Sequence, residues 1–196
     1  MRLGLDLDNT LIDYSQSVME YIHRVDNNIE ARNICDLRNA LKSDDAKWQA
    51  AQSWIYSEGL QFAKPYLSAS EVLRKFMSDG NEVFIISHKT EYSSELYGKR
   101  ELRIPAINWL KSNLDMSETS LGTSVFFESD RESKISRIEC LKLDAFVDDL
   151  IEVLIDSRFP NRTYRILFDP YFKSESKEMR IVNCLSDLLI PGSDFF

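Results

Sequence analysis

Cysteine is scarce in this sequence, and its spacing is informative. Cys35, Cys140 and Cys184 are odd in number and far apart, and none of them belongs to a Cys-x-x-Cys pair. This pattern disfavours zinc ligands and a disulfide framework, and it favours reduced, mostly buried thiols. We therefore expect the protein to reside in the cytoplasm.

Long apolar runs and an excess of basic residues are also absent. No run approaches the length of a membrane span, and no basic, apolar signal segment precedes the first strand. Acidic residues outnumber basic ones by 32 to 24, which gives a formal net charge of -8. Because such a surface repels polyphosphate backbones, we expect no nucleic-acid polymer and no membrane among the partners.

An acidic motif stands out near the N-terminus. The apolar run from Leu3 to Leu7 predicts a buried strand, and Asp6 and Asp8 lie at its C-terminal end. In an open parallel sheet this end of a strand faces the ligand site. Two carboxylates there are costly unless a cation or a shared proton offsets their charge. The motif therefore indicates a divalent metal beside a reactive carboxylate, although an isolated Asp-x-Asp-x-Thr also fits an acidic turn.

Residues 14–63 have helical periodicity, with breaks at Asn27-Asn28 and Ser43-Asp44. One helix suffices to connect two parallel strands, and three helices exceed that need. We therefore expect a small helical cap at 14–63, inserted after the first strand of a core domain formed by 1–13 and 64–196.

The rest of the chain alternates between strands and helices. Apolar runs predict further strands at 82–87, 124–127, 145–147 and 164–168. Capping boxes at Ser68–Glu71 and Ser129–Glu132 predict two helix starts, and we expect a final helix from Ser176 to Leu189. Such alternation predicts an α/β fold with a doubly wound, Rossmann-like parallel sheet.

The segment Asp6-Leu7-Asp8-Asn9-Thr10-Leu11-Ile12-Asp13 resembles the first motif of the haloacid dehalogenase-like (HAD) superfamily, whose members are mostly magnesium-dependent phosphatases. Three further elements follow in the order of that superfamily. Ser87 ends the second strand, Lys134 lies early in a helix, and Asp148-Asp149 ends a later strand. Lys142 competes with Lys134, but it lies near the end of that helix.

The resemblance implies a phosphatase mechanism. Asp6 would be the nucleophile that forms an aspartyl-phosphate, and Asp8 would be the general acid and then the general base. Mg²⁺ would be the cofactor, held by Asp6, the Asp8 carbonyl and Asp148, with Asp149 in the outer shell. Adjacent strand residues point to opposite sides, which is why one of the acidic pair is placed further out.

The phosphate itself would be held by a second group of residues. The Ser87 hydroxyl and Lys134 would contact its oxygens, and His88, next to Ser87, is a further candidate. Ser87 has an ordinary alternative as a serine that simply ends a strand, and Lys134 has one as a solvated lysine.

The sequence thus predicts a phosphatase of the capped HAD type, a monomer or homodimer that hydrolyses a small phosphate monoester. Asp8 favours phosphate esters over carbon–halogen bonds, because a dehalogenase needs neither an acid there nor a metal. Trp48, Trp54 and Tyr56 could stack on a nucleobase, so a 5'-nucleotidase is an alternative. Transfer to a second alcohol and a catalytically silent phosphate- or metal-binding regulatory module also stay open.

Overall fold

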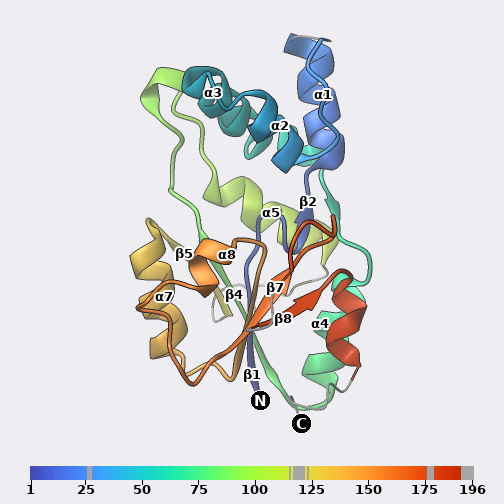
Figure 1. The fold of residues 1–196 in the computed structure, drawn as a ribbon, viewed down its shortest axis with the longest axis vertical. Helices are drawn as coiled ribbons and strands as arrows, with labels where there is room; N and C mark the ends of the chain where they lie inside the picture. The colour runs from blue at the N-terminus through green and yellow to red at the C-terminus, as the bar shows by residue number, and fades with distance from the viewer. Residues whose placement is uncertain (26–27, 115, 117–121, 123, 176–178, 191–196) are drawn as a thin grey trace.

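The computed structural model describes residues 1–25, 28–114, 116, 122, 124–175 and 179–190. Its centre is a six-stranded sheet in the order β5-β4-β1-β6-β7-β8, and every pairing in it is parallel (Figure 1). The strands are β1 (Arg2–Leu5), β4 (Glu82–His88), β5 (Val125–Glu128), β6 (Ala145–Asp148), β7 (Tyr164–Phe168) and β8 (Arg180–Val182). The prediction of an α/β fold with a doubly wound parallel sheet is confirmed.

Helices cover both faces of the sheet (Figure 1). On one face, α4 (Ala69–Ser78), α5 (Arg103–Asn113) and the 3-10 helix η3 (Leu185–Leu189) share a buried cluster with β1. On the other, α7 (Arg131–Cys140) and α8 (Ile151–Leu154) pack against β4 and β6 in a second cluster. A sheet buried on both sides explains why its strands read as apolar runs in the sequence. No helix in the described part of the chain combines the length and apolar character needed to cross a bilayer.

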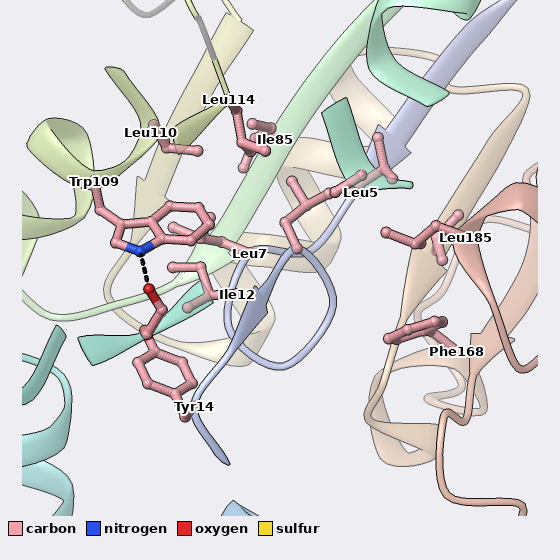
Figure 2. Close-up of a cluster of buried hydrophobic side chains, with 14 of the residues drawn as sticks. Leu5, Leu7, Ile12, Tyr14, Ile85, Trp109, Leu110, Leu114, Phe168 and Leu185 are labelled. Carbon is pink, nitrogen blue, oxygen red and sulfur yellow. Dashed lines mark hydrogen bonds between the residues drawn. The ribbon is translucent and has the colours of Figure 1, made fainter. Parts of the chain in front are cut away.

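Strand β1 is packed closely on both sides because successive side chains point to opposite faces. On the α5 side, Figure 2 shows Leu7, just beyond the strand, beside the indole ring of Trp109. On the α7 side, a Cβ added to Gly4 would lie 2.4 Å from Leu143 Cδ1 and 2.6 Å from Phe146 Cδ2. Glycine at position 4 therefore lets the side chains of Leu143 and Phe146 pack directly over β1, in the centre of the sheet.

A helical segment follows the first strand, as predicted (Figure 1). It contains α1 (Ser15–Val25), α2 (Ile34–Ala40), α3 (Asp45–Ile55) and the 3-10 helix η1 (Glu58–Phe62). The chain enters it through β2 (Ile12–Asp13) and leaves it through β3 (Lys64–Pro65), and these short strands pair in antiparallel fashion. The two connections to the sheet therefore run side by side. That residues 14–63 form a domain of their own stays a prediction.

Three local predictions are wrong. The expected final helix at 176–189 is instead β8 followed by η3, while residues 176–178 lie outside the described residues. Val182 is buried, and residues 180–182 pair with β7 as a strand although they contain only two apolar positions. The capping box at Ser68 is not formed, since Ser68 has a left-handed backbone and no side-chain cap. In α7 the cap is Asp130 rather than Ser129, and it accepts from the Ser133 amide at 2.7 Å.

Candidate active site

The C-terminal ends of β1 and β6 bring three carboxylates together. Asp6 follows directly after β1, Asp148 is the last residue of β6, and Asp149 comes next. The Asp6 amide donates to the Val147 carbonyl at 2.8 Å, which extends the contact between the strands by one residue. Carboxylate oxygens of Asp6, Asp148 and Asp149 all lie within 4.8 Å of one another. Three carboxylates in one buried place form a donor set suited to a hard cation such as Mg²⁺.

Lys134 enters this acidic cluster from the first turns of α7. Its Nζ donates to Asp6 Oδ1 at 2.5 Å and to Asp148 Oδ2 at 2.7 Å, and the residue is only 1% exposed. A buried ammonium is tolerated when it is paired in this way. Lys142, the competing candidate, is exposed just beyond the end of α7. The structure therefore brings Lys134, and not Lys142, to the carboxylates at the strand ends.

The pKa values follow from burial and charge. Burial, then the charges of Asp148 and Asp8, raise the pKa of Asp6 from 3.8 to about 7, although Lys134 acts in the opposite direction. Burial and the charges of Asp6 and Asp148 also hold the pKa of Asp149 well above 3.8. For Lys134, burial lowers the pKa, but Asp148 and Asp6 outweigh it and the pKa is raised. The cluster thus has an affinity for positive charge beyond what Lys134 supplies.

The Asp8 side chain meets a different set of partners. The Tyr14 hydroxyl donates to Asp8 Oδ1 at 2.5 Å, and Lys89 Nζ lies 3.0 Å from Asp8 Oδ2. The Ser87 hydroxyl donates to the same Oδ2 at 3.3 Å. The carboxylate of Asp8 is therefore not among the three that cluster around Lys134.

A tight turn separates the surroundings of Asp6 and Asp8. The Leu7 carbonyl accepts from the amides of Leu11 and Ile12, both at 3.0 Å. Asn9 has a φ of 62°, a left-handed conformation that asparagine tolerates better than most residues. In a continuous strand the side chains of residues 6 and 8 would share one face, and the turn breaks that period.

Ser87 and His88, both predicted to bind phosphate, end β4. Ser87 is 1% exposed and its hydroxyl faces Asp8. His88 is exposed, and its Nε2 lies 3.1 Å from the Ser129 carbonyl. Asp8 and His88 line the same cavity, but phosphate binding by Ser87 and His88 stays a prediction.

Sequence reasoning missed Lys89 and Tyr14. Lys89 follows β4 directly and is 3% exposed, and Tyr14 is 1% exposed at the entrance to α1. Both lie close to motif residues. For Lys89, a cation directly after a buried strand was a signal that the sequence offered. Tyr14 offered no such signal, because a tyrosine beside a helix start is usually a core residue.

A cavity of about 450 Å³ lies over the carboxylates, between the sheet edge and the helical segment. Trp48, Gln52 and Tyr56 line it from α3 and its C-terminal end. Of the aromatic residues considered for stacking, Trp54 is not among the lining residues, and its ring packs near Tyr21 and Phe62 instead. The space is much larger than a phosphate group, so it has room for the organic part of an ester.

The segment between β4 and α5, which carries no recognisable motif, closes the cavity from another side. It rises toward α3 and returns (Figure 1), with Tyr92 and Glu101 forming an antiparallel bridge. The Ser53 hydroxyl of α3 donates to Ser93 Oγ at 2.9 Å, and Ser93 lines the cavity. The helical segment is therefore tied to this excursion of the core as well as to β2 and β3.

No family model matches the sequence, and no curated protein sequence matches it. Solved structures do match. A protein from Bacteroides fragilis assigned to the haloacid dehalogenase-like hydrolases has 12% identity and a TM-score of 0.58, over 95% of this chain and 98% of its own. A predicted phosphoglycolate phosphatase from Haemophilus somnus has 13% identity and a TM-score of 0.54, with 95% of each chain covered. A dehalogenase has 16% identity and a TM-score of 0.56, over 95% and 94% of the two chains.

These likenesses agree with the fold described above. The chain is an α/β protein with a helical segment after its first strand and a buried carboxylate–lysine cluster at the ends of its central strands. The fold is that of the haloacid dehalogenase-like hydrolases, as the sequence motifs predicted.

Proposed function

We propose that this protein is a magnesium-dependent phosphatase that hydrolyses a small phosphate monoester through an aspartyl-phosphate intermediate. The observation that carries the proposal is the buried cluster in which Lys134 joins Asp6 and Asp148, with Asp149 alongside. A nucleophilic carboxylate, a cation and two further carboxylates in one place are the parts that phosphoryl transfer requires.

The charges of the site fit a divalent cation. Asp6, Asp8, Asp148 and Asp149 face Lys89 and Lys134, which leaves a formal excess of two negative charges. The raised pKa of Asp6 and of Asp149 expresses the same excess. Asp6, Asp148 and Asp149 would hold Mg²⁺, which places Asp149 among the ligands rather than in the outer shell expected from the sequence. The ion would neutralise charge on the phosphoryl oxygens.

Two aspartates then divide the chemistry. A carboxylate oxygen of Asp6 bonds to phosphorus while the ester bond to the leaving oxygen breaks, and Asp8 gives that oxygen a proton. In the second step Asp8 accepts a proton from water, the water oxygen bonds to phosphorus, and the acyl-phosphate bond to Asp6 breaks. Inorganic phosphate and the free carboxylate of Asp6 are the products. Lys134 stays bound to Asp6 Oδ1, so Oδ2 is the oxygen we assign to the attack.

Asp8 favours ester hydrolysis over cleavage of carbon–halogen bonds. A halide leaves without a proton, so a dehalogenase needs no acid at position 8. Here Asp8 has three side-chain partners, from Tyr14, Ser87 and Lys89, and it lines the cavity. Three side chains that hold one carboxylate at the cavity support a role for Asp8 in protonating the leaving group.

A nucleoside monophosphate is the second candidate substrate. Trp48 and Tyr56 both line the cavity, and an aromatic face there can stack on a base. The Tyr56 ring, however, already lies 4.6 Å from Lys89 Nζ and 4.9 Å from the Tyr14 ring, measured between centroids for the ring pair. A panel that includes nucleoside monophosphates and sugar phosphates separates the two substrate classes.

The test is release of inorganic phosphate from such a panel, with and without Mg²⁺, by the wild-type protein and by Asp6→Asn. We expect release that requires Mg²⁺ and is lost in Asp6→Asn. Asp79→Asn is the matched control, because Asp79 is exposed at the end of α4 and pairs with the exposed Lys75, away from the carboxylate cluster. It should leave the activity unchanged.

Two results would contradict the proposal. Activity that survives Asp6→Asn would exclude Asp6 as the nucleophile. Folded protein that binds Mg²⁺ yet releases no phosphate would favour a silent binding module, unless an added alcohol receives the phosphoryl group, in which case the protein is a transferase.

A further inference from the structure

Lys89 is a buried lysine that takes no part in the proposed mechanism described above. Its backbone is held on both sides, since its amide donates to the Glu128 carbonyl at 2.9 Å and its carbonyl accepts from Arg103 Nε at 2.9 Å. Its side chain is only 2% exposed, and the residue lines the cavity over the site. Burying an ammonium is costly, so its retention here calls for a specific partner.

That partner is the carboxylate of Asp8. Lys89 Nζ lies 3.0 Å from Asp8 Oδ2, and this contact is an ion pair rather than a well-aligned hydrogen bond. The Tyr14 hydroxyl donates to the other oxygen, Oδ1, at 2.5 Å. Each oxygen of Asp8 is thus held from a different side, and the carboxylate has one orientation.

Tyr56 completes this arrangement. Lys89 Nζ lies 4.6 Å from the centroid of the Tyr56 ring, and the Tyr14 and Tyr56 rings lie 4.9 Å apart. The aromatic rings come from the helical segment and its entrance, whereas Lys89 directly follows β4 of the core sheet. The position of the Asp8 carboxylate therefore depends on both parts of the molecule.

We propose that Lys89 is a positioning residue which, together with Tyr14, holds the Asp8 carboxylate away from the Asp6, Asp148 and Asp149 cluster and directs it to the leaving group. Without Lys89, the Asp8 side chain could turn toward a cation bound at that cluster. The inference rests on the proposed phosphatase function. It adds that the proton transfer to the leaving oxygen depends on a lysine outside the four motifs.

The leaving group provides a test. Glycerol 3-phosphate has an alkoxide leaving group that needs a proton, whereas the nitrophenolate of 4-nitrophenyl phosphate leaves without one. General acids contribute about 10²- to 10⁴-fold, so Lys89→Met should lower kcat/KM for glycerol 3-phosphate by roughly 100-fold. For 4-nitrophenyl phosphate, kcat/KM should fall by less than about 5-fold, because it reports the steps up to phosphoryl transfer.

Three further variants make the result specific. Lys89→Arg keeps the charge and should restore part of the loss with the alkyl ester. Tyr14→Phe removes a single oxygen and should show the same selective loss, which keeps the test valid if Lys89→Met does not fold. Lys75→Met, at an exposed ion pair on α4, should change neither value.

Equal losses with both esters in a folded variant, or no loss with either, would overturn the inference while the phosphatase function stands. If the wild-type protein hydrolyses neither ester nor any other phosphate ester, the proposed function and the inference fail together.

Discussion

Burial and neighbouring carboxylates disfavour the charged form of Asp6, and a bound cation would offset this cost. The stability of the metal-free protein therefore depends on pH. In the metal-free protein the pKa of Asp6 is raised from 3.8 to about 7, chiefly by burial. Between these values the folded state retains a proton that the unfolded state has released. The free energy of unfolding must therefore fall as the pH rises through this range. Asp149, whose pKa is raised for the same reasons, acts in the same direction.

We expect the metal-free protein to lose a few kcal/mol of stability, as an order of magnitude, between about pH 4 and pH 7. Urea unfolding in the presence of a chelator measures this loss at each pH. In Asp6→Asn the loss should be smaller, because one of the two titrating carboxylates is gone. Parallel pH profiles for the two proteins would show that Asp6 does not titrate in this range.

Replacement of Lys134 should also lower the free energy of unfolding. Lys134→Met keeps much of the aliphatic volume but leaves Asp6 and Asp148 buried without their ammonium partner. Removing one partner of a buried ion pair typically costs about 3–5 kcal/mol, so a loss of this size is expected in urea unfolding at pH 8.

The cost of Lys134→Met should shrink at pH 5, where the pKa of Asp6 implies that this carboxyl is largely protonated in the metal-free protein. A loss below about 1 kcal/mol at pH 8 would mean that the carboxylates find other compensation, and that the cluster is more hydrated than the buried side chains indicate.

At the scale of an element, Gly4 allows close packing on β1 in the centre of the sheet. Gly4→Ala puts a methyl group where Leu143 and Phe146 already pack, within 2.4 Å and 2.6 Å of their nearest atoms. Overpacking of this kind costs about 1–3 kcal/mol, and Asp6 follows directly after the strand that it moves. We therefore expect lower stability together with reduced activity.

A double-mutant cycle with Leu143→Ala tests the cause. Shortening Leu143 removes one of the two colliding side chains, so the double variant should lose less stability than the sum of the single variants, by about 1 kcal/mol. Additive losses would mean that the strand relaxes away from Leu143 and that Phe146 alone determines the cost.

At the scale of the whole molecule, cation binding should stabilise the fold globally. The cluster joins β1, β6 and α7, which are brought together only when the chain is folded. A ligand that binds the folded state alone, at 100 times its dissociation constant, adds about 2.7 kcal/mol to the free energy of unfolding. We expect Mg²⁺ to have this effect on the wild-type protein and to lose most of it in Asp148→Asn. An equal increase in both proteins would place the binding site elsewhere.

The sequence was sufficient to predict the order of the motifs along the chain and the residues that meet at the ends of the central strands. Asp6, Lys134 and Asp148 could be singled out because each follows or opens a periodic segment, and parallel strands bring such positions to one edge. Short segments were less predictable. Residues 180–182 contain too few apolar positions to distinguish a strand from a helix, and their place beside β7 settles it.

What the sequence by itself determined is therefore the alternation of strands and helices, the helical segment after the first strand and the acidic motif with its lysine. Only the tertiary structure decided how Asp8 is held. Its partners Tyr14 and Lys89 lie 6 and 81 positions along the chain, and no periodicity links them. The physical reason is that a buried ion pair depends on distance in space and on exclusion of water, and a sequence pattern encodes neither across separate elements.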